Sequence, residues 1–458
     1  MLVTILAFLF ILAFSITIHE FGHFLIAKLF KIPVEKFSIG YGPPLIRKKI
    51  GETDFRIAYF PLGGYVKIAG EDEGEFAQKA LNKEIPEDTE STEGTEQKNT
   101  EYTEKNGTEG TEKEPRVAGF YDAPIYKRVL IVLAGPVFNI ISAFFVYVAI
   151  FSIYGVMDLP YSRVIVEEES IAKQCGMRTN DSIVAAAGQS VSDWNKFLTL
   201  LTQHQGDTIN LSLIRGGVSH EINLPANVDS LGIQPLVPPM LGSLKLDGPA
   251  HKAGMKRGNR VQKINGEEIE SWNQMVDRVR ESKGEPLDIV WVDEGMVKKN
   301  IVSPELFYDA SSKDSIWQIG AIMPLLRRHI SIGATISLSI TEGIAKLRET
   351  LQILYQLIVG RISRRAIGGP IAIFRLSGES ARWGFEYLLS LLAIISINLG
   401  LINLFPIPAL DGGHVVISII EAVRRKRFSH RTRLIIQQVG YAIILLLIVF
   451  VTFNDITR

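Results

Sequence analysis

The chain has 458 residues, with 49 basic and 49 acidic side chains, so its formal net charge at pH 7 is zero. This balance argues against a nucleic-acid partner, and the single cysteine, Cys175, excludes an internal disulfide and a metal site built from cysteines. Hydrophobic residues make up 47% of the chain and are concentrated in blocks, which indicates a membrane protein with several domains.

Residues 1–30 contain the first apolar block and are predicted to be a membrane-spanning helix. The block has no basic residue before Lys28 and no small-residue cleavage site, so we expect it to be retained rather than removed as a signal peptide. Its length suits the ~20 residues that cross a bilayer. Lys28, Lys31 and Lys36 follow, which predicts that its C-terminal end lies on the cytoplasmic side.

The sequence His19-Glu20-Phe21-Gly22-His23 lies inside this apolar block. Positions i and i+4 share a helix face, so His19 and His23 can present two imidazole nitrogens to one ion. Glu20 occupies the place of the general base in a metalloprotease. A chance occurrence would bury these groups in hydrocarbon at a cost of about 3 kcal/mol per charge. We therefore interpret the motif as part of a zinc site.

Residues 31–70 are predicted to be a membrane-associated β region, with short strands at 34–40, 55–60 and 65–68. The region is unusually apolar for a cytoplasmic loop, and two interpretations remain open. One is a small sheet beside the active site, which membrane depth permits only where its backbone is paired or faces a wet cavity. The other is an ordinary cytoplasmic hairpin.

Residues 71–116 are rich in Glu, Thr, Gly and Lys, and the sequence Thr-Glu-Gly-Thr-Glu occurs twice in them. The segment has almost nothing apolar to bury, so we expect a disordered cytoplasmic insert. An acidic docking tail is the alternative.

Residues 127–156 are predicted to form the second span, with Gly135-Pro136 and Asn139 inside the apolar run. Small residues there allow another helix to approach closely, and a buried asparagine needs a polar partner.

The polar stretch that follows contains a repeat at an interval of 78 residues. It predicts two copies of one α+β domain, at 157–235 and 236–325. The second copy contains Ala253-Gly254-Met255 and Ile264-Asn265-Gly266, and it resembles PDZ domains of the bacterial protease type. Such domains bind an extended peptide at a sheet edge, or they act as steric gates, and both roles remain open.

The C-terminal part is predicted to contain an amphipathic helical region at 330–383, a third span at 384–405 and a fourth at 434–454. The intervening segment, 406–433, is basic, which places it in the cytoplasm. The expected fold is thus a polytopic α-helical membrane protein with four transmembrane helices, a membrane-associated β-hairpin or sheet and two tandem PDZ-like domains. Both termini and the PDZ-like pair are expected outside the cytoplasm, with the active site towards the cytoplasmic side.

A catalytic zinc needs a third protein ligand and one open position. Pro406 and Pro408 stop the third span, so residues 403–411 should be irregular backbone at membrane depth, which requires a protein-lined cavity. Asp411 is the only acid in that segment and is the preferred third ligand. His414 is the alternative, although its place after two glycines favours the start of the next helix.

Together, His-Glu-x-x-His in the first span, Gly135-Pro136 with Asn139 in the second, and Asn-x-x-Pro-x-Pro-x-Leu-Asp-Gly after the third resemble the site-2 protease family, the M50-type intramembrane zinc metalloproteases. The resemblance covers nearly the whole chain. Only the insert at 71–116 is longer than the family leads us to expect.

The resemblance implies a Zn²⁺ endopeptidase in the bacterial inner membrane, with His19, His23 and Asp411 as ligands and Glu20 as base. Its implied substrates are single-pass membrane proteins, namely an anti-sigma factor after a first extracytoplasmic cut and remnant signal peptides. The family's substrate-handling positions match Asn403, Pro406 and Pro408, and the PDZ-like pair would filter substrates by size. Two alternative functions are a membrane-anchored scaffold and a zinc-dependent transporter. A scaffold would need no acid such as Asp411 at the depth of the histidines. A transporter would usually show an inverted repeat of spans, whereas the repeat in this sequence lies outside the spans.

Overall fold

The computed structural model describes residues 1–70, 119–226, 231–309, 314–361 and 368–457. The predicted insert at 71–116 lies outside the described residues. The chain divides into two compact units: Met1–Val146 with Gly343–Ser377 and Leu392–Arg458, and Tyr147–Glu342 with Gly378–Leu391. Each unit is described by itself below.

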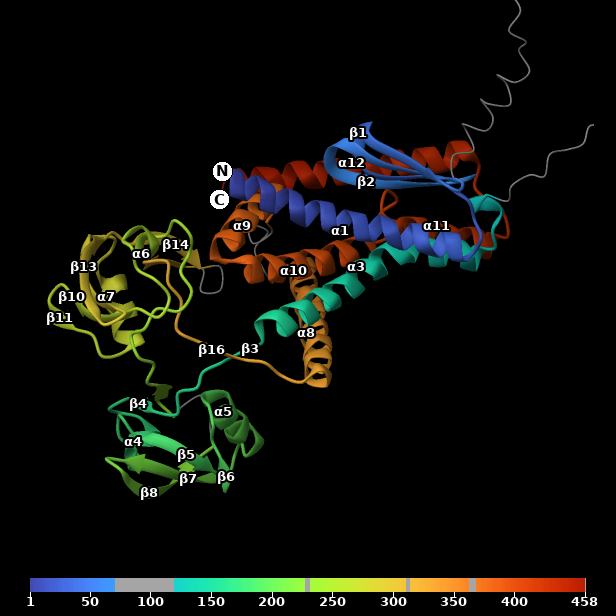
Figure 1. Ribbon diagram of the computed structural model, residues 1–458. Helices are drawn as coiled ribbons and strands as arrows, with labels where there is room; N and C mark the ends of the chain where they lie inside the picture. Colours follow the sequence, from blue (N-terminus) through green and yellow to red (C-terminus); the bar gives the residue numbers. More distant parts are fainter. Residues whose placement is uncertain (71–118, 227–230, 310–313, 362–367, 458) are drawn as a thin grey trace, which may run out of the picture. The chain divides into compact units, whose positions relative to one another are not determined.

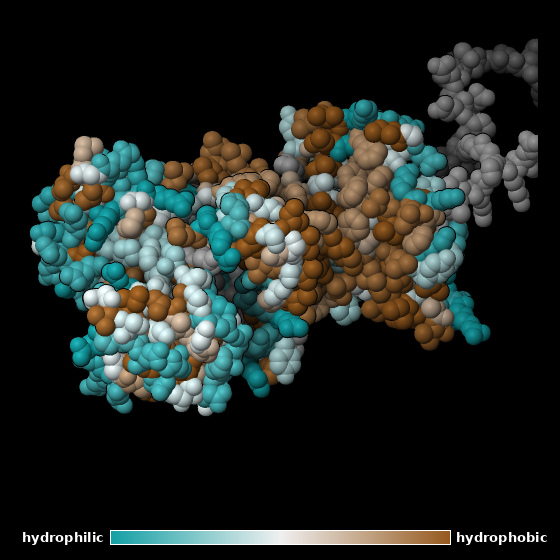
Figure 2. Space-filling model, turned by 60° about the horizontal axis from the view of Figure 1, so that its bottom comes forward, coloured by the Kyte–Doolittle hydropathy of each residue, from teal (hydrophilic) through white to brown (hydrophobic). Residues whose placement is uncertain are grey.

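The chain is a membrane-integral protein. The described residues include four helices that are long and apolar enough to cross a membrane (Figure 1). They are α1 (Leu2–Leu29), α3 (Ile125–Tyr154), α10 (Phe385–Asn403) and α12 (His430–Thr457). Hydrophobic side chains form a broad brown area over the helical part of the molecule in Figure 2. An apolar surface of this kind is stable against lipid chains but not against water.

Glycines let the spanning helices of the first unit approach backbone to backbone. A Cβ at Gly22 of α1 would lie 2.6 Å from the carbonyl oxygen of Ala134 in α3. A Cβ at Gly400 of α10 would lie 2.8 Å from the carbonyl oxygen of Pro136. Small residues are what close packing between membrane helices requires, because lipid provides no hydrophobic driving force for helix association. α3 is thereby held against both α1 and α10.

The β region is one antiparallel pair, β1 (Val34–Ile50) with β2 (Thr53–Ile68). Residues 34–39 pair with 54–57 on one side and with 64–68 on the other. The end of β2 therefore returns to pair with the start of β1. Within the described part of the chain, segment 64–68 is paired on one side only and forms an edge. Phe24 of α1 packs against Phe37 and Phe55, at ring-centroid distances of 5.4 and 5.6 Å. The region therefore lies against α1.

The predicted strand limits differ from the observed ones. The predicted strands at 55–60 and 65–68 are parts of a single strand, β2, and β1 continues ten residues beyond Gly40. The reason is the fold-back pairing. Residues 44–50 gain a partner in 53–58, and local sequence does not reveal this pairing.

The second unit contains two small sheets with the same strand order, β6-β5-β7-β8 and β11-β10-β12-β13. In the first, β5 (Ser182–Ala186) is followed by α5 (Trp194–Gln203); in the second, β10 (Arg260–Ile264) is followed by α7 (Trp272–Glu281). Each domain has its own apolar core, built around Phe197 in one and Met275 in the other. The remaining strands of the two sheets are β6 (Gln189–Ser190), β7 (Thr208–Arg215), β8 (Val218–Pro225), β11 (Glu267–Glu268), β12 (Leu287–Asp293) and β13 (Met296–Val302).

Shorter elements complete the domains and connections. They are η1 (Phe120–Asp122), β3 (Val156–Asp158), β4 (Val164–Val166), α4 (Ile171–Gln174), β9 (Ile233–Pro235), α6 (Pro249–Lys252), β14 (Glu305–Asp309), β15 (Asp314–Gln318) and β16 (Leu326–Arg328). After them come α8 (Ile332–Ile358), α9 (Pro370–Trp383) and α11 (Asp411–Arg424). α8 leaves apolar residues such as Ile336, Ile340 and Ile344 exposed, as an amphipathic helix does.

Candidate metal centre

His19, His23 and Asp411 form a compact cluster in the first unit. Their candidate ligand atoms all lie within 4.8 Å of one another. The Nε2 atoms of the two histidines are 3.2 Å apart; Asp411 Oδ2 lies 3.0 Å from His19 Nε2, and Oδ1 lies 3.6 Å from His23 Nε2. The histidines come from successive turns of α1, and the aspartate is the first residue of α11. Among the described residues this is the one group of three or more such side chains close enough to hold an ion.

α3 orients both imidazole rings. The backbone carbonyl of Ile131 lies 2.8 Å from His23 Nδ1 and accepts its proton, which leaves the Nε2 lone pair directed at the cluster. Asn139 is fully buried, and its amide lies 3.2 Å from His19 Nδ1. An amide can present its oxygen there by a half turn, and then His19 Nδ1 donates and its Nε2 is also free to bind a metal. The sequence predicted a polar partner for Asn139 but not that the partner is His19.

The residues of the cluster fit a divalent metal ion. Asp411 Oδ2 is buried and accepts no hydrogen bond from any described residue, although it lies 3.0 Å from His19 Nε2. Two imidazole lone pairs and a carboxylate oxygen directed at one another repel unless a proton or a cation lies between them. Two nitrogen ligands and one carboxylate form a donor set typical of catalytic zinc.

Gly135 leaves the space that the rings occupy. A Cβ at this position would lie 2.3 Å from His23 Nε2 and 2.8 Å from His19 Cε1. The sequence indicated only that small residues here would allow a close approach of another helix. The structure shows that the approaching groups are the two imidazoles, a relationship that no spacing rule reveals.

Glu20 lies next to the edge of the β region. Its carboxylate accepts a hydrogen bond from the backbone N–H of Val66, and a Cβ at Gly64 would lie 3.3 Å from its Cγ. The predicted base therefore has the two histidines of the cluster beside it on α1 and segment 64–68 against its side chain. Of the two interpretations of the β region, the structure places the sheet beside the motif.

The loop between α10 and α11 carries the other predicted site residues. Asn403 ends α10, and its amide nitrogen lies 3.3 Å from His19 Nε2, whereas Pro406 and Pro408 lie in the turn that follows. This turn folds onto the start of α11, where a Cβ at Gly412 would lie 2.3 Å from the carbonyl oxygen of Leu404. The close approach brings Asp411 back to the histidines at the end of α10.

His414, the alternative third ligand, lies in the first turn of α11 and is not part of the cluster. Burial lowers the pKa of its ring.

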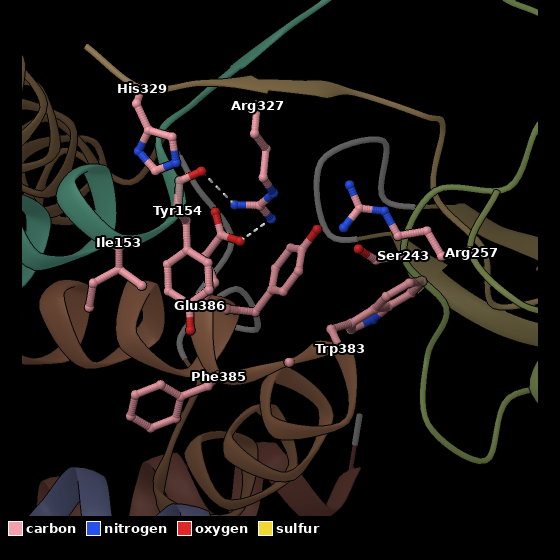
Figure 3. A pocket seen from close by; sticks show the side chains of 11 residues that line it. Ile153, Tyr154, Ser243, Arg257, Arg327, His329, Trp383, Phe385 and Glu386 are labelled. Carbon is pink, nitrogen blue, oxygen red and sulfur yellow. Dashed lines mark hydrogen bonds and ion pairs between the residues drawn. The ribbon is translucent and has the colours of Figure 1, made fainter.

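A separate cavity of about 340 Å³ lies in the second unit (Figure 3). Arg327 crosses it, donating to the carbonyl oxygen of Tyr154 and pairing with Glu386, and Trp383 and Arg257 line its other side. The residues that line it include neither the three residues of the cluster nor Glu20. The cavity is therefore separate from the candidate metal centre.

Two histidines and a glutamate on the membrane-spanning helix α1, with an aspartate from the start of α11 beside the histidines, form the arrangement expected of a membrane-embedded metalloprotease. The family model of peptidase family M50 matches residues 7–447, and the chain belongs to this family.

Full-length relatives agree with this assignment. The regulator of sigma E protease of Haemophilus influenzae is 31% identical over 485 residues, covering 99% of this chain and 98% of that protein. The regulator of sigma-E protease RseP of Escherichia coli is 30% identical over 484 residues with the same coverage. A protein of Pasteurella multocida, named as a zinc metalloprotease, is 30% identical over 480 residues, again with 99% and 98% coverage. The chain is a zinc metalloprotease, and the predicted family and cofactor are confirmed.

Proposed function

We propose that this chain is an intramembrane endopeptidase of the bacterial inner membrane that cleaves single-pass membrane proteins during sigma-E regulation. The observation that carries the proposal is the cluster of His19, His23 and Asp411, which draws two ligands from a membrane-spanning helix. Polar groups within a span are costly unless they serve a site. Relatives named for the regulation of sigma E support an anti-sigma factor as the substrate. Remnant signal peptides are a second substrate class.

In this proposal His19, His23 and Asp411 hold the zinc ion and Glu20 is the general base. Zinc in such a site polarises the scissile carbonyl and makes a water molecule more acidic. Glu20 takes a proton from the attacking water and returns it to the leaving amine. The Ile131 carbonyl and Asn139 hold the two imidazoles in the tautomers that leave Nε2 unprotonated.

The substrate must be extended before it can be cut, because a helix hides its carbonyls in i→i−4 hydrogen bonds. We propose that the unwound segment adds as a strand to residues 64–68, the edge of the β region beside Glu20. Asn403, whose amide lies at His19, offers a further hydrogen-bonding group, and Pro406 and Pro408 keep the adjoining loop from becoming helical. These three residues would position substrate.

We further propose that both termini and the two small domains lie in the periplasm and the metal centre towards the cytoplasm. Six basic residues, from the last residue of α11 to the first turn of α12, support this orientation. They are Arg424, Arg425, Lys426, Arg427, Arg431 and Arg433. The repeated domains, which we infer to be PDZ-like, would exclude substrates whose outer domain has not been trimmed.

The test is to purify the wild-type protein and Glu20→Gln and to incubate each with a trimmed single-pass substrate. Cleavage and bound zinc are then measured together. We expect Glu20→Gln to keep its zinc and to lose cleavage by about 10²–10⁴-fold, the usual contribution of a general base. Equal cleavage by both would assign the activity to another protease. A wild-type protein that binds no zinc and cleaves nothing in native membranes would favour a scaffold.

A further inference from the structure

A buried ion-pair network lies in the first unit, ten residues along α11 from Asp411. Its centre is Glu421, which is 3% exposed. Arg128 of α3 donates from NH1 to Oε2 at 3.0 Å, and Arg433 of α12 donates from NH2 to Oε1 at 2.8 Å. The backbone N–H of Phe428 also donates to Oε1, at 3.0 Å. One carboxylate thus joins three helices.

The aromatic ring of Tyr121 completes the network. The guanidinium groups of Arg433 and Arg128 lie 4.0 and 5.8 Å from the centre of this ring. The side chains of Arg128 and Glu421 are 3% and 2% exposed, so water provides little compensation if the carboxylate is lost. The two guanidinium groups then lose the carboxylate that they share, and the ends of α3, α11 and α12 are no longer held together by it.

Two of the three helices joined by Glu421, α11 and α3, contribute to the metal centre. α11 begins at Asp411, and a helix transmits a displacement along its axis because each residue rises a fixed ~1.5 Å. α3 carries Arg128 and, less than one turn later, the Ile131 carbonyl that holds His23. The contact between Glu421 and Arg128 therefore fixes where Asp411 lies along α3, and α3 in turn orients the two histidines.

We propose that Glu421 is a positioning residue for the zinc centre, acting through α11 on Asp411. This inference rests on the proposed assignment of His19, His23 and Asp411 as the zinc ligands. The near end of α11 is held by the close approach of Gly412 to the Leu404 carbonyl, and the far end by Glu421. Two fixed ends leave Asp411 little freedom to move away from the histidines.

The test uses full-length protein that has been stripped of metal. Zinc affinity is measured by competition with a chelator, the ligand geometry by the visible spectrum of bound Co²⁺, and folding by the melting temperature. Glu421→Gln keeps the shape and removes the charge, and we expect zinc affinity to fall at least about tenfold with an altered Co²⁺ spectrum. Glu421→Asp keeps the charge one methylene shorter and should give an intermediate loss.

Asp455 provides the matched control. It is also a buried carboxylate that joins two elements of the first unit, accepting from the backbone N–H groups of Gly369 and Ala372 at 2.9 and 3.0 Å. It caps α9, which provides no metal ligand. Asp455→Asn should lower the melting temperature and leave zinc affinity and the Co²⁺ spectrum unchanged.

The proposal is overturned if Glu421→Gln melts earlier but binds zinc and Co²⁺ as the wild type does, because Glu421 then only stabilises the fold. If Glu421→Gln does not fold, Glu421→Asp and Arg128→Lys replace it, since both keep the charges. A wild-type zinc affinity and Co²⁺ spectrum in both would overturn the proposal equally. A wild-type protein that binds no zinc would instead contradict the proposed metal centre.

Discussion

Asp411 Oδ2 lies 3.0 Å from His19 Nε2, although the two residues stand near opposite ends of the sequence. The contact depends on the backbone approaches at Gly22 and Gly400, which bring α1, α3 and α10 together, and on the turn that folds Asp411 back to the end of α10. The candidate metal centre therefore depends on how the helices pack, and zinc binding should be sensitive to changes in that packing.

Asp411 and His414 are the two candidates for the third zinc ligand, and replacing each by alanine should show which of them binds the metal. Asp411→Ala removes a carboxylate from the cluster, so we expect the zinc affinity to fall by at least about 100-fold. His414→Ala removes a ring outside the cluster and should change zinc affinity much less. Zinc content after gel filtration checks both. The reverse order of the two variants would make His414 the ligand.

Gly135→Ala should damage the centre without unfolding the protein. The new Cβ would lie 2.3 Å from His23 Nε2, so one ring must move away and zinc binding is lost. Gly343→Ala in α8 is the matched control, because a Cβ there meets nothing within 4 Å; it should be neutral or stabilising by about 0.5–1 kcal/mol. Zinc content and melting temperature are measured for both. Full zinc occupancy in Gly135→Ala would show that the rings have more room than the structure gives them.

Proline substitutions in the edge segment should reveal strand addition. Tyr65→Pro and Val66→Pro each remove one backbone N–H, and neighbouring residues of a strand direct this group to opposite sides. One of the two N–H groups points away from segment 34–39, towards the unpaired edge. We expect the substitution that removes this group to reduce cleavage about tenfold or more, because it raises the KM for an extended substrate. Val66→Pro also removes the hydrogen bond to Glu20 and should lower kcat. Unchanged cleavage by both variants would argue against strand addition.

The ion pair between Asp181 and Arg215 predicts a pH dependence of stability in the second unit. Burial raises the pKa of Asp181, but hydrogen bonds from the Arg215 side chain and the Arg178 backbone outweigh it and hold the pKa below its ordinary value. This contribution to stability is present above the unfolded value, about pH 4, and is lost as the pH falls through the lower folded value.

Asp181→Asn should destabilise the protein by about 2 kcal/mol at pH 7 and weaken the decline of its melting temperature below pH 4. Asp207→Asn replaces an exposed aspartate of the same domain and serves as the control. Melting curves at pH 7 and between pH 5 and 3 measure both effects. An equal decline in wild type and Asp181→Asn would contradict the role given to this ion pair.

The four spans, the β region and the two histidines could be predicted from the sequence because they depend on local patterns. A run of about 20 apolar residues can satisfy its backbone in lipid only as a helix, and a spacing of four residues places His19 and His23 on one face. Asp411 was also predicted, because it is the only acid in a segment that two prolines keep from being helical.

The contacts around those residues were decided by the tertiary structure. That Asn139 and the Ile131 carbonyl orient the imidazoles, that Gly135 makes room for them, and that Glu421 joins α11 to α3 all involve pairs more than 100 residues apart. Local sequence sets which residues share a helix face. It does not set how far one helix is shifted along another, and that shift is determined by close packing between the helices.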